Sequence, residues 1–406
     1  MVKFLDYVIY WSIIFIPFSM ATSPVPVSIF SGFLIVAYLV KQALKKEGIF
    51  PKTAINLPLL LFFLITCISI VNSINFRDTF KGGILRLLQY AFIFFIMAKE
   101  IKDKKHVRII VFSVLVGLVL ASIDGIFQVI TGFDFIRHWA PIINMGLVRA
   151  TASFKDSNTF GIYLSALAPL LLGLALYYYK GSKRMFFVLA SVISVIGIYL
   201  TYSRPTLLAI YIVLFFLSII RRDKIVIISL VVLTVISPFI APKGVKDWAK
   251  QVDYDPIRFM CNDDRIAIFR NSMNMIKHNP ILGVGANTFM KNYKKYKENP
   301  EYMNIVTSDY LYAHNNFLQL TAELGFIGLA VFLWLLYKLF SESVAIYRKL
   351  KDDYLRIVSL SLIACLIAFL INGLTESSLN SSRVALIFWY LCGFSLSLKN
   401  FIKSEK

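Results

Sequence analysis

The chain has 406 residues, of which 58% are hydrophobic and 16% are charged, and its mean hydropathy is +0.70. Because a soluble domain carries about a quarter of charged residues, this composition excludes a water-soluble globular protein. The net charge of +20 would suit a nucleic-acid-binding protein, but the lysines stand between apolar runs. No basic run with interleaved aromatic residues occurs outside those runs. We therefore expect a membrane protein that contacts membrane lipids and no nucleic acid.

Apolar runs of about 17 to 25 residues recur along the chain, and a helix of that length crosses a bilayer. Since a membrane span must satisfy its own backbone polar groups, the sequence predicts an all-α polytopic membrane protein with about 12 transmembrane helices. The predicted spans are 5–20, 25–40, 56–71, 83–98, 107–130, 159–179, 185–201, 205–220, 225–240, 315–340, 357–372 and 384–398.

The short connections between these spans alternate in charge, which predicts their orientation. Lysine and arginine gather in every second connection, at 41–52, 99–108, 180–184, 221–224 and 348–356. The positive-inside rule places these connections in the cytoplasm. Because the number of predicted spans is even, both termini are expected on that same side.

One outward connection, 241–313, is long and polar, and it divides the chain into three expected parts. Residues 1–240 would hold the first nine spans, 241–313 a large outward loop with short helices, and 314–406 the last three spans. A loop of this length is usually functional. Within it, 264–277 has the pattern of an amphipathic helix with a cap at 262–264. The expected apolar stripe is Ile266, Phe269, Met273 and Ile276.

Cations on the outward side are unexpected and therefore informative. Taken singly, each could be a solvated side chain or one that touches lipid headgroups. Together they predict a basic outward surface that suits an anionic substrate such as a phosphate ester. These residues are Arg77, Lys81, Arg86, Arg137, Arg149, Lys155, Arg204 and Arg383.

Arg204 and Arg265 are both predicted at the start of a helix. Pro205 suits the first helical turn, so Arg204 should stand at the N-terminus of its span. A cation there opposes the helix dipole, at a cost of several tenths of a kcal/mol, which a bound anion would reverse. Arg265 repeats this pattern in the outward loop, although a local ion pair with Asp263 and Asp264 would explain it equally well.

His314 stands where the polar loop enters the tenth predicted span. A helix N-terminus favours the neutral imidazole, which is the form that a general base needs. Arginines that neutralise an anionic leaving group and a histidine that deprotonates an acceptor hydroxyl make a plausible mechanism. A structural histidine is the alternative. No DxD-like acidic pair accompanies these residues, so we expect neither a metal nor another cofactor.

Several segments resemble known ones. Residues 314–328, HNNFLQLTAELGFIG, resemble the signature of the bacterial O-antigen ligase and polymerase superfamily. The segment 279–285, NPILGVG, resembles part of that family's large periplasmic loop, and 149–158 and Ser203-Arg204 resemble its earlier outward segments. The resemblance covers the middle and C-terminal two-thirds of the chain. Pro205 departs from the family pattern, in which a small residue is common.

This resemblance implies a GT-C-type glycosyltransferase in the bacterial inner membrane, with cytoplasmic termini and a site that faces the periplasm. The ligases transfer a glycan from undecaprenyl pyrophosphate to a sugar hydroxyl of lipid A–core, without a metal and with inversion. The resemblance places Arg204 and Arg265 at the pyrophosphate and His314 as the base. Further substrate-binding candidates are Arg149, Lys155, Asn158, Asn315 and Arg383.

Three alternatives differ in acceptor or chemistry. A polymerase of the same superfamily would use a second lipid-linked glycan as acceptor, and a protein-directed transferase would carry an added C-terminal periplasmic domain. A lipid-linked glycan transporter would carry out no bond chemistry and would place ionisable residues at mid-membrane. The length and the single large loop favour the ligase.

Overall fold

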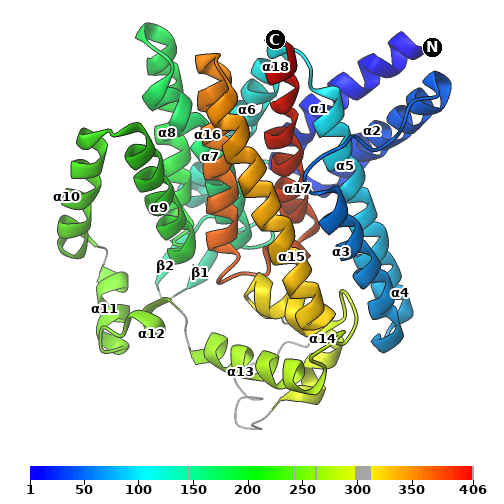
Figure 1. Cartoon of the computed structure of the whole chain (residues 1–406). Helices are drawn as coiled ribbons and strands as arrows, with labels where there is room; N and C mark the ends of the chain where they lie inside the picture. Colours follow the sequence, from blue (N-terminus) through cyan, green and yellow to red (C-terminus); the bar gives the residue numbers. More distant parts are fainter. Residues whose placement is uncertain (145, 242, 261–262, 298–311, 405–406) are drawn as a thin grey trace.

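The computed structural model describes residues 1–144, 146–241, 243–260, 263–297 and 312–404. The structure is a bundle of helices (Figure 1). Within the described ranges it also has one antiparallel hairpin, which lies between α6 (Lys104–Thr131) and α7 (Ser157–Tyr177) and in which Ile142 pairs with Arg149. The first helices are α1 Val2–Thr22, α2 Pro24–Lys45, α3 Asn56–Ile68, η1 Ser69–Asn72, α4 Phe76–Asp78, the π-helix η2 Thr79–Leu85, α5 Arg86–Glu100 and α6 Lys104–Thr131. The hairpin strands are β1 Ile142–Asn144 and β2 Leu147–Arg149.

The remaining helices follow the hairpin. Those before the loop are α7 Ser157–Tyr177, α8 Gly181–Leu200, α9 Arg204–Arg221 and α10 Lys224–Ile240. The loop contains α11 Lys243–Gln251, α12 Pro256–Met260, α13 Asp263–His278, α14 Phe289–Tyr293 and η3 Lys294–Tyr296. The last elements are α15 Asn316–Lys349, α16 Asp353–Asn372, η5 Ser378–Asn380, α17 Ser382–Ser397 and α18 Lys399–Ser404.

Ten helices in the described chain are long and apolar enough to cross a membrane, and α10 with α11 makes an eleventh if the two count as one broken span. The prediction of an all-α polytopic membrane protein is therefore confirmed. Each of the twelve predicted spans overlaps a helix, but the predicted number was slightly high. The difference arises because α3 and α10 have only 13 and 17 residues, which is short for a straight span.

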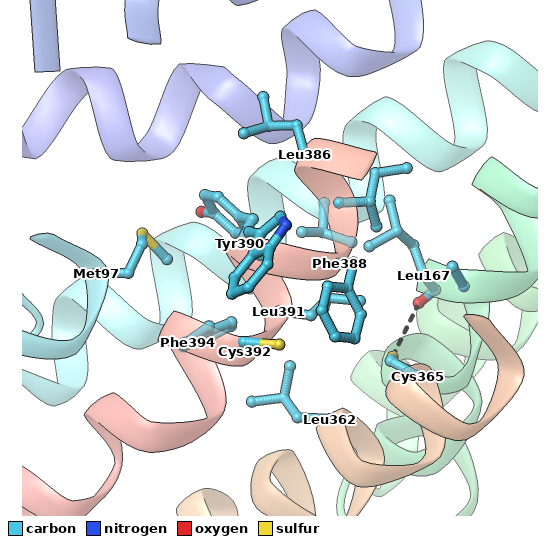
Figure 2. Packing of buried hydrophobic residues seen from close by; sticks show 14 of the residues in the cluster. Met97, Leu167, Leu362, Cys365, Leu386, Phe388, Tyr390, Leu391, Cys392 and Phe394 are labelled. Carbon is cyan, nitrogen blue, oxygen red and sulfur yellow. Dashed lines mark hydrogen bonds between the residues drawn. The ribbon is translucent and has the colours of Figure 1, made fainter. Parts of the chain in front are cut away.

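The two termini lie at one end of the bundle, and α11 to α14 lie beyond the other end (Figure 1). Because α7, α16 and α17 are mostly buried, they form the centre of the bundle. Figure 2 shows this packing, in which Phe388, Leu391 and Cys392 of α17 lie near Leu362 and Cys365 of α16. In lipid, such close van der Waals packing is what holds helices together.

The chain after α13 crosses α15 at a kink. Gly325 has a φ of 68° inside α15, which interrupts the helical hydrogen bonding at that point. Val284 N–H donates to the Ala322 carbonyl at 2.9 Å, and Phe326 N–H donates to the Pro280 carbonyl at 2.7 Å. The two segments that carry the family resemblance, 279–285 and 314–328, are therefore one hydrogen-bonded unit.

The amphipathic helix predicted in the loop is present as α13, but its buried face was predicted partly wrong. Ile276 is buried as expected, whereas Met273 is 43% exposed. The buried cluster is instead formed by Ile268, Met275 and Ile276 with Tyr293 and other residues that follow α13. The predicted cap at 262–264 lies outside the part of the chain whose side chains the structure describes.

We predict that Gly325→Ala destabilises the protein by at least about 2 kcal/mol, because a left-handed alanine is strained. The new Cβ would also clash with the Ile281 carbonyl oxygen. The thermal unfolding midpoint in detergent measures the loss. Gly32→Ala is the control, since nothing lies within 4 Å of the added Cβ and its φ is helical. Equal midpoints for Gly325→Ala and wild type would contradict the role of this crossing.

Candidate active site

One carboxylate lies at the centre of the site. Glu376 stands between α16 and α17, and its side chain is 13% exposed. Its Oε2 is 3.0 Å from His314 Nδ1. Its Oε1 accepts a hydrogen bond from Asn158 Nδ2 at 2.7 Å and also forms an ion pair with Arg265. The carboxylate thus joins the start of α7, the start of α13 and the residues before α15. We call Glu376, His314, Arg265, Asn158 and Arg149 the Glu376 cluster.

Arg149 reaches this cluster from the end of β2. Its Nη2 donates to Asn158 Oδ1 at 2.9 Å, and its Nε donates to the Thr201 carbonyl at 2.8 Å. Burial lowers the pKa of Arg149, and the nearby charge of Arg265 lowers it further, whereas the charges of Asp156 and Glu376 act in the opposite direction. Two guanidinium groups, those of Arg149 and Arg265, therefore lie near two carboxylates, those of Glu376 and Asp156, so charges of both signs meet at this site.

The pKa of Glu376 lies below its ordinary value. Burial by itself would raise this pKa, but the hydrogen bond from His314, the charge of Arg265 and the hydrogen bond from Asn158 outweigh burial. Since an ionised carboxylate only accepts hydrogen bonds, His314 Nδ1 carries the hydrogen. In the neutral ring, Nε2 is then the nitrogen that can accept a proton, as a general base requires.

The two asparagines after His314 hold Glu376 in place. Asn315 caps α15 by accepting from Phe317 N–H at 2.8 Å, and its amide donates to the Leu374 carbonyl at 2.8 Å. Asn316 donates to Ser378 Oγ at 2.8 Å, and its own N–H donates to the Gly373 carbonyl at 2.7 Å. The residues on both sides of Glu376 are therefore fixed to the start of α15. These contacts support a positioning role for Asn315, which was expected to bind substrate.

The backbone is strained at three places around the cluster. His314 has a φ of 47°, Tyr202 a φ of 46° and Ala152 a φ of 46°. Non-glycine residues adopt this left-handed region rarely, at a cost of about 1 to 2 kcal/mol each. One of these residues precedes α15, one precedes α9, and one follows Arg149. Strain of this kind accumulates at functional sites, because the surrounding contacts hold a geometry that the local chain would not choose.

Arg204 is the first residue of α9, with Pro205 in the first turn, as the sequence predicted. Its Nη1 donates to the Phe259 carbonyl, and its guanidinium lies over the ring of Trp248, 5.4 Å from the centroid. These contacts direct Arg204 toward α11 and α12. The segment between α8 and α9 is joined to the Glu376 cluster by the Thr201 carbonyl, which accepts a hydrogen bond from Arg149.

The other two predicted binding residues lie elsewhere. Lys155 is exposed just before α7. Arg383 does not line an outward surface, because its side chain is 8% exposed and stacks on Phe154 at 3.9 Å. Its Nη2 also donates to the Ser153 carbonyl at 3.0 Å. Arg383 thus joins the start of α17 to the segment before α7.

Glu376 was not predicted from the sequence, because the outward side was considered for cations and for paired acidic residues, and Glu376 is a single acidic residue. A signal was present: Glu376 is the only charged residue between Arg356 and Arg383. A lone acidic residue in a short connection between two apolar spans is uncommon, because no neighbouring charge offsets its desolvation. Within the described ranges, no group of three or more His, Cys, Asp or Glu side chains is placed to hold a metal ion.

Comparison with known proteins finds one similarity. Residues 189–333 match the family model described as O-antigen ligase. The match runs from within α8 to within α15, so it includes Arg204, Arg265 and His314 and leaves out Asn158 and Glu376. No curated protein matches the chain at a significant level. The chain is thus a multi-pass membrane protein that is similar, over this segment, to a family acting on lipid-linked glycans.

Glu376 should make stability depend on pH in the acid range. Because its pKa in the folded protein lies below the ordinary value of 4.5, its ionised form contributes stability that is complete above pH 4.5 and is lost as the pH falls through the folded pKa. We predict that the thermal unfolding midpoint of wild type falls more steeply below pH 4.5 than that of Glu376→Gln. Parallel curves for the two proteins would show that the Glu376 carboxylate is not stabilised as described.

Proposed function

We propose that this protein is an O-antigen ligase, which transfers a glycan from undecaprenyl pyrophosphate to a sugar hydroxyl of lipid A–core. The observation that carries the proposal is the contact between His314 Nδ1 and the Glu376 carboxylate beside Arg265 and Arg149. The match of residues 189–333 to the O-antigen ligase family supports it. Because ligases and polymerases share that family model, the match does not distinguish between their acceptors, and the choice of lipid A–core is our proposal.

In the proposed reaction, His314 is the general base. The acceptor hydroxyl gives its proton to His314 Nε2 while its oxygen forms a bond to the anomeric carbon of the glycan. Glu376 keeps the hydrogen on Nδ1 and stabilises the imidazolium that forms, as a carboxylate does in other histidine-dependent sites. Attack from the face opposite the leaving group inverts the anomeric centre.

The arginines act on the leaving group. As the new bond forms, the bond from the anomeric carbon to the pyrophosphate oxygen breaks, and undecaprenyl pyrophosphate leaves with the electron pair. Arg265 and Arg149 stand next to the proposed base, and Arg204 starts α9 on the other side of Thr201. Charge-assisted bonds from guanidinium groups to pyrophosphate oxygens would stabilise the developing charge without a metal.

The proposed site faces the periplasm, and both termini are cytoplasmic. The short connections that are rich in lysine and arginine join helices at the end of the bundle that also carries the termini, away from the Glu376 cluster (Figure 1). The positive-inside rule then assigns that end to the cytoplasm. Single cysteines are introduced at Lys155 and Lys183 in a protein whose native Cys261, in the outward loop, is replaced by serine. Their accessibility to an impermeant thiol reagent in intact cells tests this orientation, with labelling expected at position 155 alone.

One assay separates the ligase from its rivals. Purified protein is incubated with undecaprenyl-pyrophosphate glycan and lipid A–core, and the lipids are resolved on a gel. Glycan on lipid A–core supports the ligase, whereas longer undecaprenyl-linked glycan identifies a polymerase. Absence of any covalent product, with a redistribution of the lipid across vesicles, would identify a transporter.

We predict that His314→Ala and Arg204→Ala each lower glycan transfer at least about 100-fold, since the first removes the base and the second a charge that stabilises the leaving group. The gel assay measures the effect, and size-exclusion profiles show that the variants are folded. His278→Ala is the matched control, because His278 is an exposed residue at the end of α13 whose ring contacts the Asn274 carbonyl of its own helix and the ring of Tyr296. Retained transfer in either site variant would refute the role given to that residue.

We also predict that transfer continues in excess EDTA, because arginines carry the charge of the leaving group in this mechanism. Rates with and without chelator should agree within about twofold. Magnesium or manganese added back provides the control. A loss of activity in EDTA that is restored by one of these ions would refute the metal-independent mechanism.

A further inference from the structure

A cavity lies at the end of the bundle opposite the Glu376 cluster. It has a volume of about 450 Å³ and is lined by Arg108 of α6, Tyr178 and Tyr179 after α7, and Lys183, Phe186 and Phe187 of α8. These residues belong to the beginning of α6, the end of α7 and the beginning of α8. The opposite ends of α7 and α8 reach the Glu376 cluster, through Asn158 and through the Leu200 carbonyl that accepts from Ala150 N–H. The two sites are therefore separated by the length of a span.

The cavity is positively charged. Arg108 and Lys183 are both exposed, and within the described chain neither takes part in an ion pair. Arg108 is held over the ring of Tyr354, 5.4 Å from its centroid, which fixes its direction without neutralising it. Two cations without a carboxylate partner, of which Arg108 is held in place, favour a ligand that supplies the negative charge.

The cavity is also continuous with an apolar surface. Phe187 forms its floor, buried and stacked on Tyr179 at 4.3 Å between ring centroids. On the outer face of α8, Phe186, Leu189 and Val192 are 50%, 55% and 49% exposed. Their spacing of three residues places them along one side of the helix. A ligand whose charged group lies in the cavity would therefore meet an apolar strip that runs along α8 toward the middle of the membrane.

We propose that this cavity binds an anionic glycerophospholipid of the surrounding leaflet. Its phosphate would lie between Arg108 and Lys183, its glycerol against the tyrosines, and one acyl chain along Phe186, Leu189 and Val192. A zwitterionic lipid carries its own cation beside the phosphate and loses much of this attraction. A soluble phosphate makes no use of the apolar strip. Basic pockets between transmembrane helices at the cytoplasmic boundary are where anionic headgroups bind other membrane proteins.

The proposal does not depend on the activity assigned to the Glu376 cluster, and binding tests it directly. The full-length protein in detergent is titrated with phosphatidylglycerol or phosphatidylcholine, and bound lipids are counted by native mass spectrometry. We expect wild type to bind one phosphatidylglycerol at least about tenfold more tightly than phosphatidylcholine, since each cation near a headgroup contributes about 1 kcal/mol. Arg108→Ala/Lys183→Ala should lose this preference.

The matched control is Lys45→Ala/Lys52→Ala, which removes the same charge from exposed positions at the same end of the bundle. It should bind phosphatidylglycerol like wild type, and lipid-free unfolding midpoints show whether each variant is folded. The proposal is overturned if wild type shows no preference, or if the control loses the preference as fully as the cavity variant. It is also overturned if glycerol 3-phosphate displaces phosphatidylglycerol at equal concentration, since that result identifies a site for soluble phosphates.

Discussion

A carboxylate buried at the edge of an apolar bundle must be satisfied by donors, and the arrangement around Glu376 follows from that requirement. His314, Asn158 and Arg265 supply the donors from three segments that are far apart in the sequence. Removing one of these donors would leave part of the buried carboxylate unsatisfied, at a cost of about 1 to 3 kcal/mol. The interaction that holds these segments together is thus the one that orients the imidazole.

A second buried carboxylate, that of Glu323, holds part of the large loop against the bundle in a similar way. Glu323 of α15 accepts from the Asn287 N–H at 2.8 Å and the Phe289 N–H at 3.3 Å, and so fixes the start of α14. The same stretch is tied to the first half of the bundle, where Thr79 Oγ1 donates to the Ala286 carbonyl at 2.9 Å. Because α13 packs on this stretch, the loop has an anchored part close to the bundle, and Arg265 at the start of α13 can reach Glu376.

Much of the fold was predictable from sequence, because spans are specified by local hydropathy and length. Each predicted span overlaps a helix, Arg204 begins α9, and His314 stands just before α15, as Pro205 and the polar-to-apolar transition indicated. The contacts between segments were not predictable. Nothing in the local sequence pairs Asn158 with Glu376, which are separated by 218 positions. The exposure of Met273 and the burial of Arg383 likewise depend on which neighbours pack against them.

The central claim is that Glu376 and His314 act as one unit, and a double-mutant cycle in the transfer reaction tests it most directly. Rates are measured for wild type, His314→Ala, Glu376→Gln and the double variant. If Glu376 acts through His314, the double variant should be slower than His314→Ala by no more than about threefold, because groups that act together are strongly non-additive. If the two losses multiply, Glu376 and His314 act independently and the account is wrong.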